Sequence, residues 1–92
     1  MNLEYEQIGK WLNSYQISKV INTINRSKKV EITDGSPDGK LSHIVIKGTT
    51  TPVGYIGADN QIEKVNPKDE SLKIYHDFLE RIYKIITNAD RV

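Results

Sequence analysis

The chain has 92 residues, of which 37% are hydrophobic and 27% are charged, and its formal net charge is +1. This length fits one domain spanning residues 1–92, and the composition is that of a folded soluble protein, which excludes an intrinsically disordered chain. Without cysteine, the chain can form neither disulfides nor thiolate metal sites, and no apolar run approaches membrane-spanning length.

Charge is unevenly distributed along the chain. Residues 8–30 contain no acidic side chain but five basic ones, whereas the remainder has 8 basic and 12 acidic residues, so the two parts carry +5 and −4. The basic stretch is also rich in Asn, Gln and Ser. Lys and Arg attract phosphates, and neutral hydrogen-bonding side chains can reach base edges. The stretch therefore favours a nucleic-acid partner. The acidic, polar N-terminus does not resemble a signal peptide, so we expect a cytoplasmic protein.

Two groups of apolar residues with helical spacing precede residue 27. The first group is Ile8, Trp11, Leu12 and Tyr15; the second is Ile17, Val20, Ile21 and Ile24. The two stripes are out of phase at about 100° per residue. This predicts two helices with a break near Asn13 and Ser14, either of which can cap the second helix. One long helix with a two-sided apolar surface is the alternative.

The middle of the chain has strand and turn patterns. Apolar alternation and short apolar runs predict strands near residues 30–32, 41–47, 53–56 and 62–65. Between the first two, residues 34–39 are dense in Asp, Gly, Ser and Pro, which is typical of a turn. We expect these strands to form a small antiparallel meander.

The last segment predicts a long helix that begins at Pro67, with Asn66 as its N-cap. One apolar row recurs at spacings of 3 and 4, and Ile74, Phe78 and Ile85 form a second row beside it. Because such spacing is also a coiled-coil signal, we expect a homodimer through the first row. That predicted dimer interface consists of Leu72, Tyr75, Leu79, Ile82 and Ile86. The expected fold class is α+β, with an N-terminal helix pair or broken helix, the meander and the long C-terminal helix.

Residues 4–47 resemble a winged helix-turn-helix DNA-binding domain. Ile8, Gly9 and Leu12 stand in the order expected for the first helix, and a polar face follows in the second. The resemblance implies a recognition helix in the major groove and a hairpin wing near the DNA backbone. The order helix, three strands, helix also occurs in double-stranded RNA-binding domains, but the basic patch expected at the start of their last helix is missing here.

We therefore expect a small non-enzymatic protein that binds double-stranded DNA, such as a regulator or an accessory factor of a mobile element. The predicted DNA-contacting residues are Gln16, Ser18, Lys19, Asn22, Thr23, Arg26, Lys28, Lys29 and Lys40. The alternative function is a protein-binding module or inhibitor that uses the apolar C-terminal helix or a strand edge.

Neither catalytic nor cofactor-binding signatures stand out in the chain. His43 and His76 lie far apart in sequence, and phosphate-cradling glycine loops and nucleophile motifs are missing. Asp34, Ser36 and Asp38 resemble the start of a calcium loop, but the twelfth position, which requires a bidentate Glu, is Val45. We expect a hairpin turn there, with no metal and no cofactor.

Overall fold

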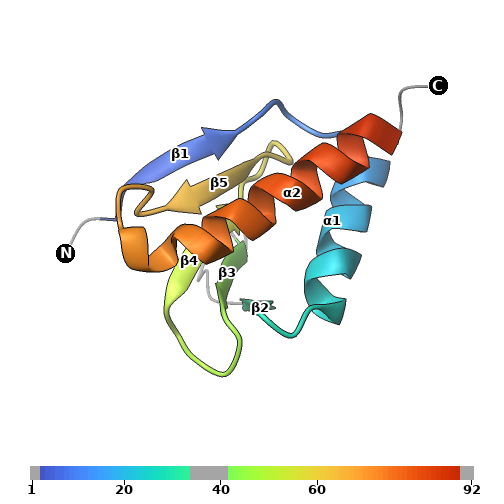
Figure 1. The fold of residues 1–92 in the computed structure, drawn as a ribbon. Coiled ribbons are helices and arrows are strands. Elements are labelled where there is room, and N and C mark those ends of the chain that lie inside the picture. Colours follow the sequence, from blue (N-terminus) through green and yellow to red (C-terminus); the bar gives the residue numbers. More distant parts are fainter. Residues whose placement is uncertain (1–2, 34–41, 90–92) are drawn as a thin grey trace.

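The computed structural model of the chain describes residues 3–33 and 42–89. Within these ranges the elements are β1 (Tyr5–Ile8), α1 (Ser14–Arg26), β2 (Val30–Thr33), β3 (Ser42–Ile46), β4 (Pro52–Ile56), β5 (Ile62–Val65), a 3-10 turn η1 (Glu70–Leu72) and α2 (Lys73–Ala89). Figure 1 shows α2 lying across the strands, with α1 beside its C-terminal half. The predicted α+β class and long C-terminal helix are confirmed.

The strands form one antiparallel sheet in the order β1-β5-β4-β3-β2. Strands β2 to β5 are neighbours in sequence and in space, which is the predicted meander. Strand β1 adds to the far edge, where Tyr5 pairs with Val65 and Ile8 pairs with Ile62. The first strand of the chain thus lies beside the last, as the blue and yellow arrows in Figure 1 show.

One face of the sheet carries the core. The strand register places Ile8, Ile44 and Ile62 on the same face, where they pack against buried residues of both helices. The helical part of this core consists of Ile17, Val20, Ile24, Leu79, Ile82 and Ile86. A Cβ on Gly54 would lie 2.7 Å from a methyl carbon of Leu79 and 2.9 Å from a backbone oxygen in β5. Glycine at this position therefore lets α2 approach the sheet closely.

The predicted N-terminal helix pair is not present, because residues 5–8 form an edge strand. Two of the four residues in the first apolar stripe, Ile8 and Leu12, are buried, but Trp11 and Tyr15 are exposed. These four residues therefore do not form one buried face of a helix. Gly9, with φ +62°, turns the chain after the strand. The winged helix-turn-helix resemblance thus lacks the first of its two helices, and the turn at 34–39 lies outside the described residues.

The last helix begins later than the sequence predicts. Asn66 has a φ of 53°, so it stands in a turn and does not cap a helix. Its side-chain oxygen accepts from the Glu4 N–H at 3.1 Å, and its own N–H donates to the Glu4 carbonyl at 2.7 Å. Asn66 thus ties the end of β5 to the start of β1. Asp69 caps the short η1 turn, and α2 starts at Lys73.

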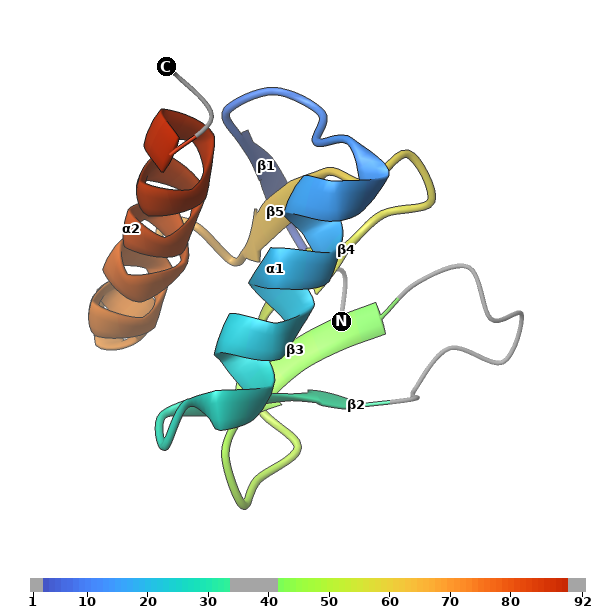
Figure 2. The ribbon, with the colours of Figure 1, turned by 90° about the vertical axis from the view of Figure 1, so that its right-hand side faces the viewer.

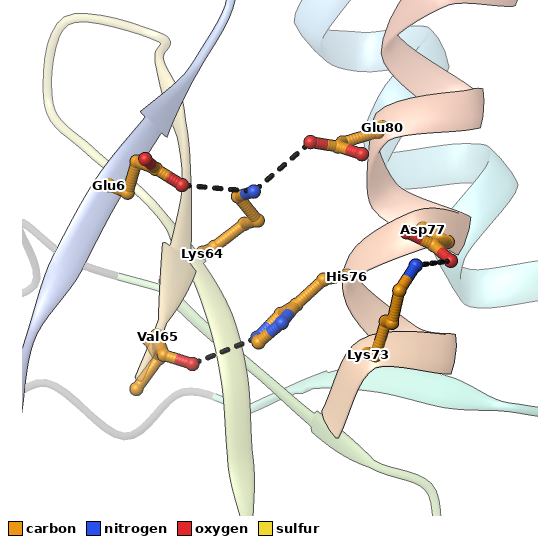
Figure 3. Close-up of polar contacts among 7 residues, drawn as sticks. All are labelled: Glu6, Lys64, Val65, Lys73, His76, Asp77 and Glu80. Atoms are coloured by element: carbon orange, nitrogen blue, oxygen red, sulfur yellow. Dashed lines mark hydrogen bonds and ion pairs between the residues drawn. The ribbon is translucent and has the colours of Figure 1, made fainter. Parts of the chain in front are cut away.

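Polar contacts join α2 to the sheet edge, as Figure 3 shows. Lys64 on β5 forms ion pairs with Glu6 on β1 at 2.9 Å and with Glu80 on α2 at 3.1 Å. The hydrogen bond to Glu6 is the main cause of the raised pKa of Lys64. The buried ring of His76 contacts the Val65 carbonyl through Nε2 at 2.9 Å. These contacts fix β1, β5 and α2 relative to one another.

Candidate nucleic-acid interface

Helix α1 is well defined at its start. Asn13 accepts a hydrogen bond from the Gln16 N–H at 2.7 Å, and the Gln16 side-chain oxygen accepts from the Asn13 N–H at 3.0 Å. This reciprocal capping box satisfies two backbone donors that a helix start leaves open. Of the two predicted cap residues, Asn13 and Ser14, it is Asn13 that caps α1, although no helix precedes it among the described residues.

The outward side of α1 carries a polar and basic stripe, which we call the α1 stripe: Tyr15, Lys19, Asn22 and Arg26. At about 100° per residue these positions lie opposite the buried Ile17, Val20 and Ile24. All four are exposed, as are Ser18 and Asn25 beside them. The Lys19 ammonium lies 4.6 Å from the centre of the Tyr15 ring, a cation–π contact. The sequence-predicted Lys19, Asn22 and Arg26 therefore share one open face.

Two of the predicted DNA-contacting residues have structural tasks in α1. Gln16 is half-buried, and its side-chain oxygen belongs to the capping box. The Thr23 hydroxyl donates to the Lys19 carbonyl at 2.8 Å, so its proton is already used in a hydrogen bond within α1. Ser18, Lys19, Asn22 and Arg26 are therefore the better placed residues of the predicted set.

A cluster of cations forms where α1 ends and the sheet begins. Arg26, Lys28 and Lys29 lie close together in sequence, with only Ser27 between them, and are exposed. The Ser27 hydroxyl accepts from the Lys29 N–H at 2.9 Å, and the Lys47 N–H donates to the Lys29 carbonyl at 3.0 Å. The Lys47 ammonium also donates to the Ser27 carbonyl at 3.3 Å.

Lys47 is thus a fourth cation of this cluster, although it lies far from the other three in sequence. The pairing of Val30 with Ile46 is what brings it there, so only knowledge of the strand register could have identified it. Glu31 stands two residues after Lys29, and its carboxylate accepts from the Gly48 N–H at 2.8 Å. The predicted Lys40 lies outside the described residues.

A groove separates the two helices beside the α1 stripe. Its volume is about 390 Å³, with Lys19, Asn22, Thr23 and Arg26 on one wall and Ile85, Ile86 and Ala89 on the other. Further along, the Lys29 ammonium lies 5.5 Å from the centre of the Phe78 ring. Figure 2 shows the two helices side by side, with α1 towards the viewer. Among the described residues that line this groove, none is acidic, so the groove pairs a cationic wall with an apolar one.

The predicted dimer row on α2 is mostly interior. Leu72, Leu79, Ile82 and Ile86 are buried within the chain, and only Tyr75 is half-buried. These four side chains pack against the sheet and α1, so they are not available to a second chain. The exposed apolar surface of α2 lies instead on the second row, where Ile74 is 59% exposed and Ile85 is 61% exposed.

Two aromatic residues that the helical spacing assigns to a packed face are at the surface. Trp11 is 67% exposed and Tyr15 is 62% exposed. Large exposed aromatic side chains are uncommon on a monomer and are enriched where proteins bind partners. Tyr15 is the first residue of the α1 stripe, and Trp11 precedes α1 in the chain, so base stacking or protein contact can use both.

The histidines and carboxylates do not assemble a reactive centre in the described part of the chain. His76 is buried against a backbone carbonyl, and the ring of His43 lies 6.0 Å from that of Tyr55, tilted by 41°, on the opposite face of the sheet. No group of three or more potential metal ligands occurs among the residues that the structure describes. Within those residues, neither helix is long and apolar enough to span a membrane.

Comparison of the chain with protein-family models, with curated proteins and with solved structures found no match. The α1 stripe, the cation cluster and the groove are therefore the features on which a function can be argued.

Proposed function

We propose that this chain is a small non-enzymatic DNA-binding protein that contacts DNA through the α1 stripe and the adjoining cation cluster. The observation that carries the proposal is the alignment of Lys19, Asn22 and Arg26 on one exposed face that continues into Lys28, Lys29 and Lys47. The cations attract the negatively charged phosphates of DNA, and exposed amide side chains can form hydrogen bonds with the edges of its bases.

The residues divide into two roles. Arg26, Lys28, Lys29 and Lys47 hold phosphates, because they are exposed or partly exposed cations gathered at one end of α1. Asn22 and Ser18 are the residues placed to read base edges, since the side chain of Asn can form two hydrogen bonds to adenine. Double-stranded DNA is the proposed partner, and a cytoplasmic location belongs to the same proposal.

A DNA titration tests the proposal. We would measure the fluorescence anisotropy of a labelled mixed-sequence duplex at several salt concentrations, with the wild-type chain and with Arg26→Ala/Lys28→Ala/Lys29→Ala. Non-specific binding typically has a dissociation constant of about 10⁻⁴ to 10⁻⁶ M, and log K falls by about 0.9 per log unit of salt for each phosphate contact. The triple variant should bind more weakly, and the slope of log K against log salt should become shallower by about one unit for each of the three lost phosphate contacts.

The matched control is Lys68→Ala/Lys73→Ala/Lys84→Ala, which removes the same charge from exposed positions away from the α1 stripe. This control should bind nearly as tightly as the wild type. Equal loss in both triple variants would mean that net charge alone attracts DNA. No binding by the wild type at low salt would overturn the proposal.

Protein binding is the second candidate function. It is favoured by the exposure of Ile74 and Ile85 on α2, because the chain leaves these two large aliphatic side chains without cover. If the DNA titration fails, this surface becomes the first candidate.

A further inference from the structure

The side chain of Trp11 is exposed although the backbone on both sides of it is anchored. The Lys10 N–H donates to the Tyr83 hydroxyl at 2.8 Å, and the Leu12 N–H donates to the Asn60 carbonyl at 3.0 Å. The Leu12 side chain is buried in the core, whereas the indole of Trp11 lies at the surface. The fold therefore presents this ring to solvent from a fixed backbone, which lowers the entropy lost when a partner covers it.

Tyr15 presents a second exposed aromatic ring, in the first turn of α1. The Lys19 ammonium lies 4.6 Å from the centre of this ring, so an aromatic surface and a positive charge stand side by side. Lys10, next to Trp11 in sequence, is a further exposed cation, and Asp59 is the charged residue of the β4–β5 turn that anchors this segment. Aromatic rings that stack on bases, combined with cations that attract phosphates, are how proteins bind single-stranded nucleic acid.

Unpaired bases are the partners that such rings reach most easily. In a duplex both faces of a base are covered by its neighbours, so a side chain must first open a base step, which costs free energy. An unpaired base offers its face without that cost. The centre of a protein interface is instead depleted of lysine, whereas Lys10 and Lys19 accompany these two rings. The surroundings of the rings therefore favour a base over a protein side chain.

The aromatic rings and the cation cluster lie at opposite ends of α1. From Tyr15 to Arg26 there are 11 residue steps, and the helix rises about 16 Å over them at about 1.5 Å per residue. This is roughly the length of five nucleotides along one DNA strand, at about 3.4 Å each. One DNA molecule can thus contact both ends of α1, with its duplex part at the cation cluster and its unpaired part at the rings.

We propose that Trp11 and Tyr15 stack on unpaired bases, so that the chain binds a junction between duplex and single-stranded DNA. This inference rests on the proposed function, because it adds a stacking site to the same DNA contact. The two rings distinguish unpaired from paired DNA, whereas the cation cluster attracts both forms. The preference is for DNA structure and not for sequence, because every base has a face on which a ring can stack.

Three kinds of labelled DNA with a common duplex separate stacking from charge. They are the blunt duplex, the duplex with a single-stranded overhang of about five nucleotides on a 5′ or a 3′ end, and the same overhangs built from abasic nucleotides, which keep the phosphates but lack the bases. In anisotropy titrations at one salt concentration, the wild type should bind an overhang with bases about tenfold more tightly than its abasic counterpart. Trp11 is the only tryptophan of the chain, so its fluorescence should be quenched by the overhang with bases and by neither of the other two DNAs.

Substitutions of Trp11 test whether this residue causes the preference. Trp11→Ala should lose most of the tenfold difference, and Trp11→Phe should keep most of it, because a phenyl ring still stacks. The matched control is Ile74→Ala, which removes an exposed apolar side chain from α2 and should bind like the wild type. Equal binding of both overhangs by the wild type would overturn the stacking site and leave the proposed duplex contact in place. Failure to bind any of the DNAs would overturn both proposals and leave the rings to a protein partner.

Discussion

At the scale of single residues, Gly9 shows how the chain passes from β1 to α1. Its φ is +62°, and an added Cβ would overlap the ring of Tyr83 on α2. The Tyr83 hydroxyl also accepts from the Lys10 N–H at 2.8 Å, so the connection is held against α2. Gly9 is therefore required by both backbone conformation and space.

We expect Gly9→Ala to destabilise the chain by about 2–5 kcal/mol, because left-handed strain and steric overlap add together. Gly48 is the matched control, since its φ is +80° but nothing lies within 4 Å of an added Cβ. Gly48→Ala should cost only the strain, about 1–2 kcal/mol. Urea unfolding of both variants measures the difference, and equal losses would contradict the close approach of Tyr83.

Tyr55 makes stability depend on pH in the alkaline range. Burial, with the hydrogen bond to Glu63 as a second cause, raises its pKa from 10.0 to about 12. The hydroxyl donates to the Glu63 carboxylate at 2.5 Å. Between these two pKa values the folded chain keeps a proton that the unfolded chain releases. Stability is therefore highest below pH 10 and falls as the pH rises towards 12.

Replacing Tyr55 by Phe should flatten this decline, because the titrating group is gone. Glu63→Gln removes the second cause and should move the pKa of Tyr55 part of the way back towards its ordinary value. Urea midpoints at several pH values, with ultraviolet absorbance of the phenolate, measure both effects. An unchanged alkaline decline in Tyr55→Phe would assign it to other groups.

At the scale of elements, local sequence patterns predict a helix or strand correctly where its packing or pairing partner lies nearby in the sequence. The meander and the last helix follow from apolar alternation and helical spacing, and Asn13 identifies the start of α1. Strand β1 could not be predicted in this way, because its pairing partner Val65 is far along the chain. Pairing with β5 overrides the helical spacing of residues 8–15.

The same limit applies to the candidate site. Helical spacing predicts that Lys19, Asn22 and Arg26 share a polar face of the second helix, and in the structure all three are exposed on α1. It could not indicate that Lys47 joins the cluster, nor that Gln16 and Thr23 bond to their own helix. On α2, periodicity gives two apolar rows, but only the position of the sheet decides which row is interior.

The two rows of α2 should respond differently to truncation. Leu79 is 1% exposed and packs at Gly54, so Leu79→Ala should lower the free energy of unfolding by about 2–5 kcal/mol. Ile85→Ala, at an exposed position, should change it by less than about 0.5 kcal/mol at concentrations where the chain is monomeric. Thermal or urea unfolding at low concentration measures both. Similar effects of the two substitutions would contradict the placement of Leu79 in the interior and of Ile85 at the surface.

At the scale of the whole molecule, the helices cover one face of the sheet and leave a groove between them that is cationic on one side and apolar on the other. The proposed DNA contact uses the cationic side and continues over the outward surface of α1, which carries the α1 stripe.

The most direct test of the central claim is to map the DNA contact by NMR. A ¹⁵N-labelled chain at low concentration would be titrated with a mixed-sequence duplex at low salt, and backbone amide shifts would be followed. We expect the largest changes at residues 15–29 and at Lys47, which carry the α1 stripe and the cation cluster. Changes confined to β1, β5 or the N-terminal half of α2, or no changes at all, would contradict DNA recognition by α1.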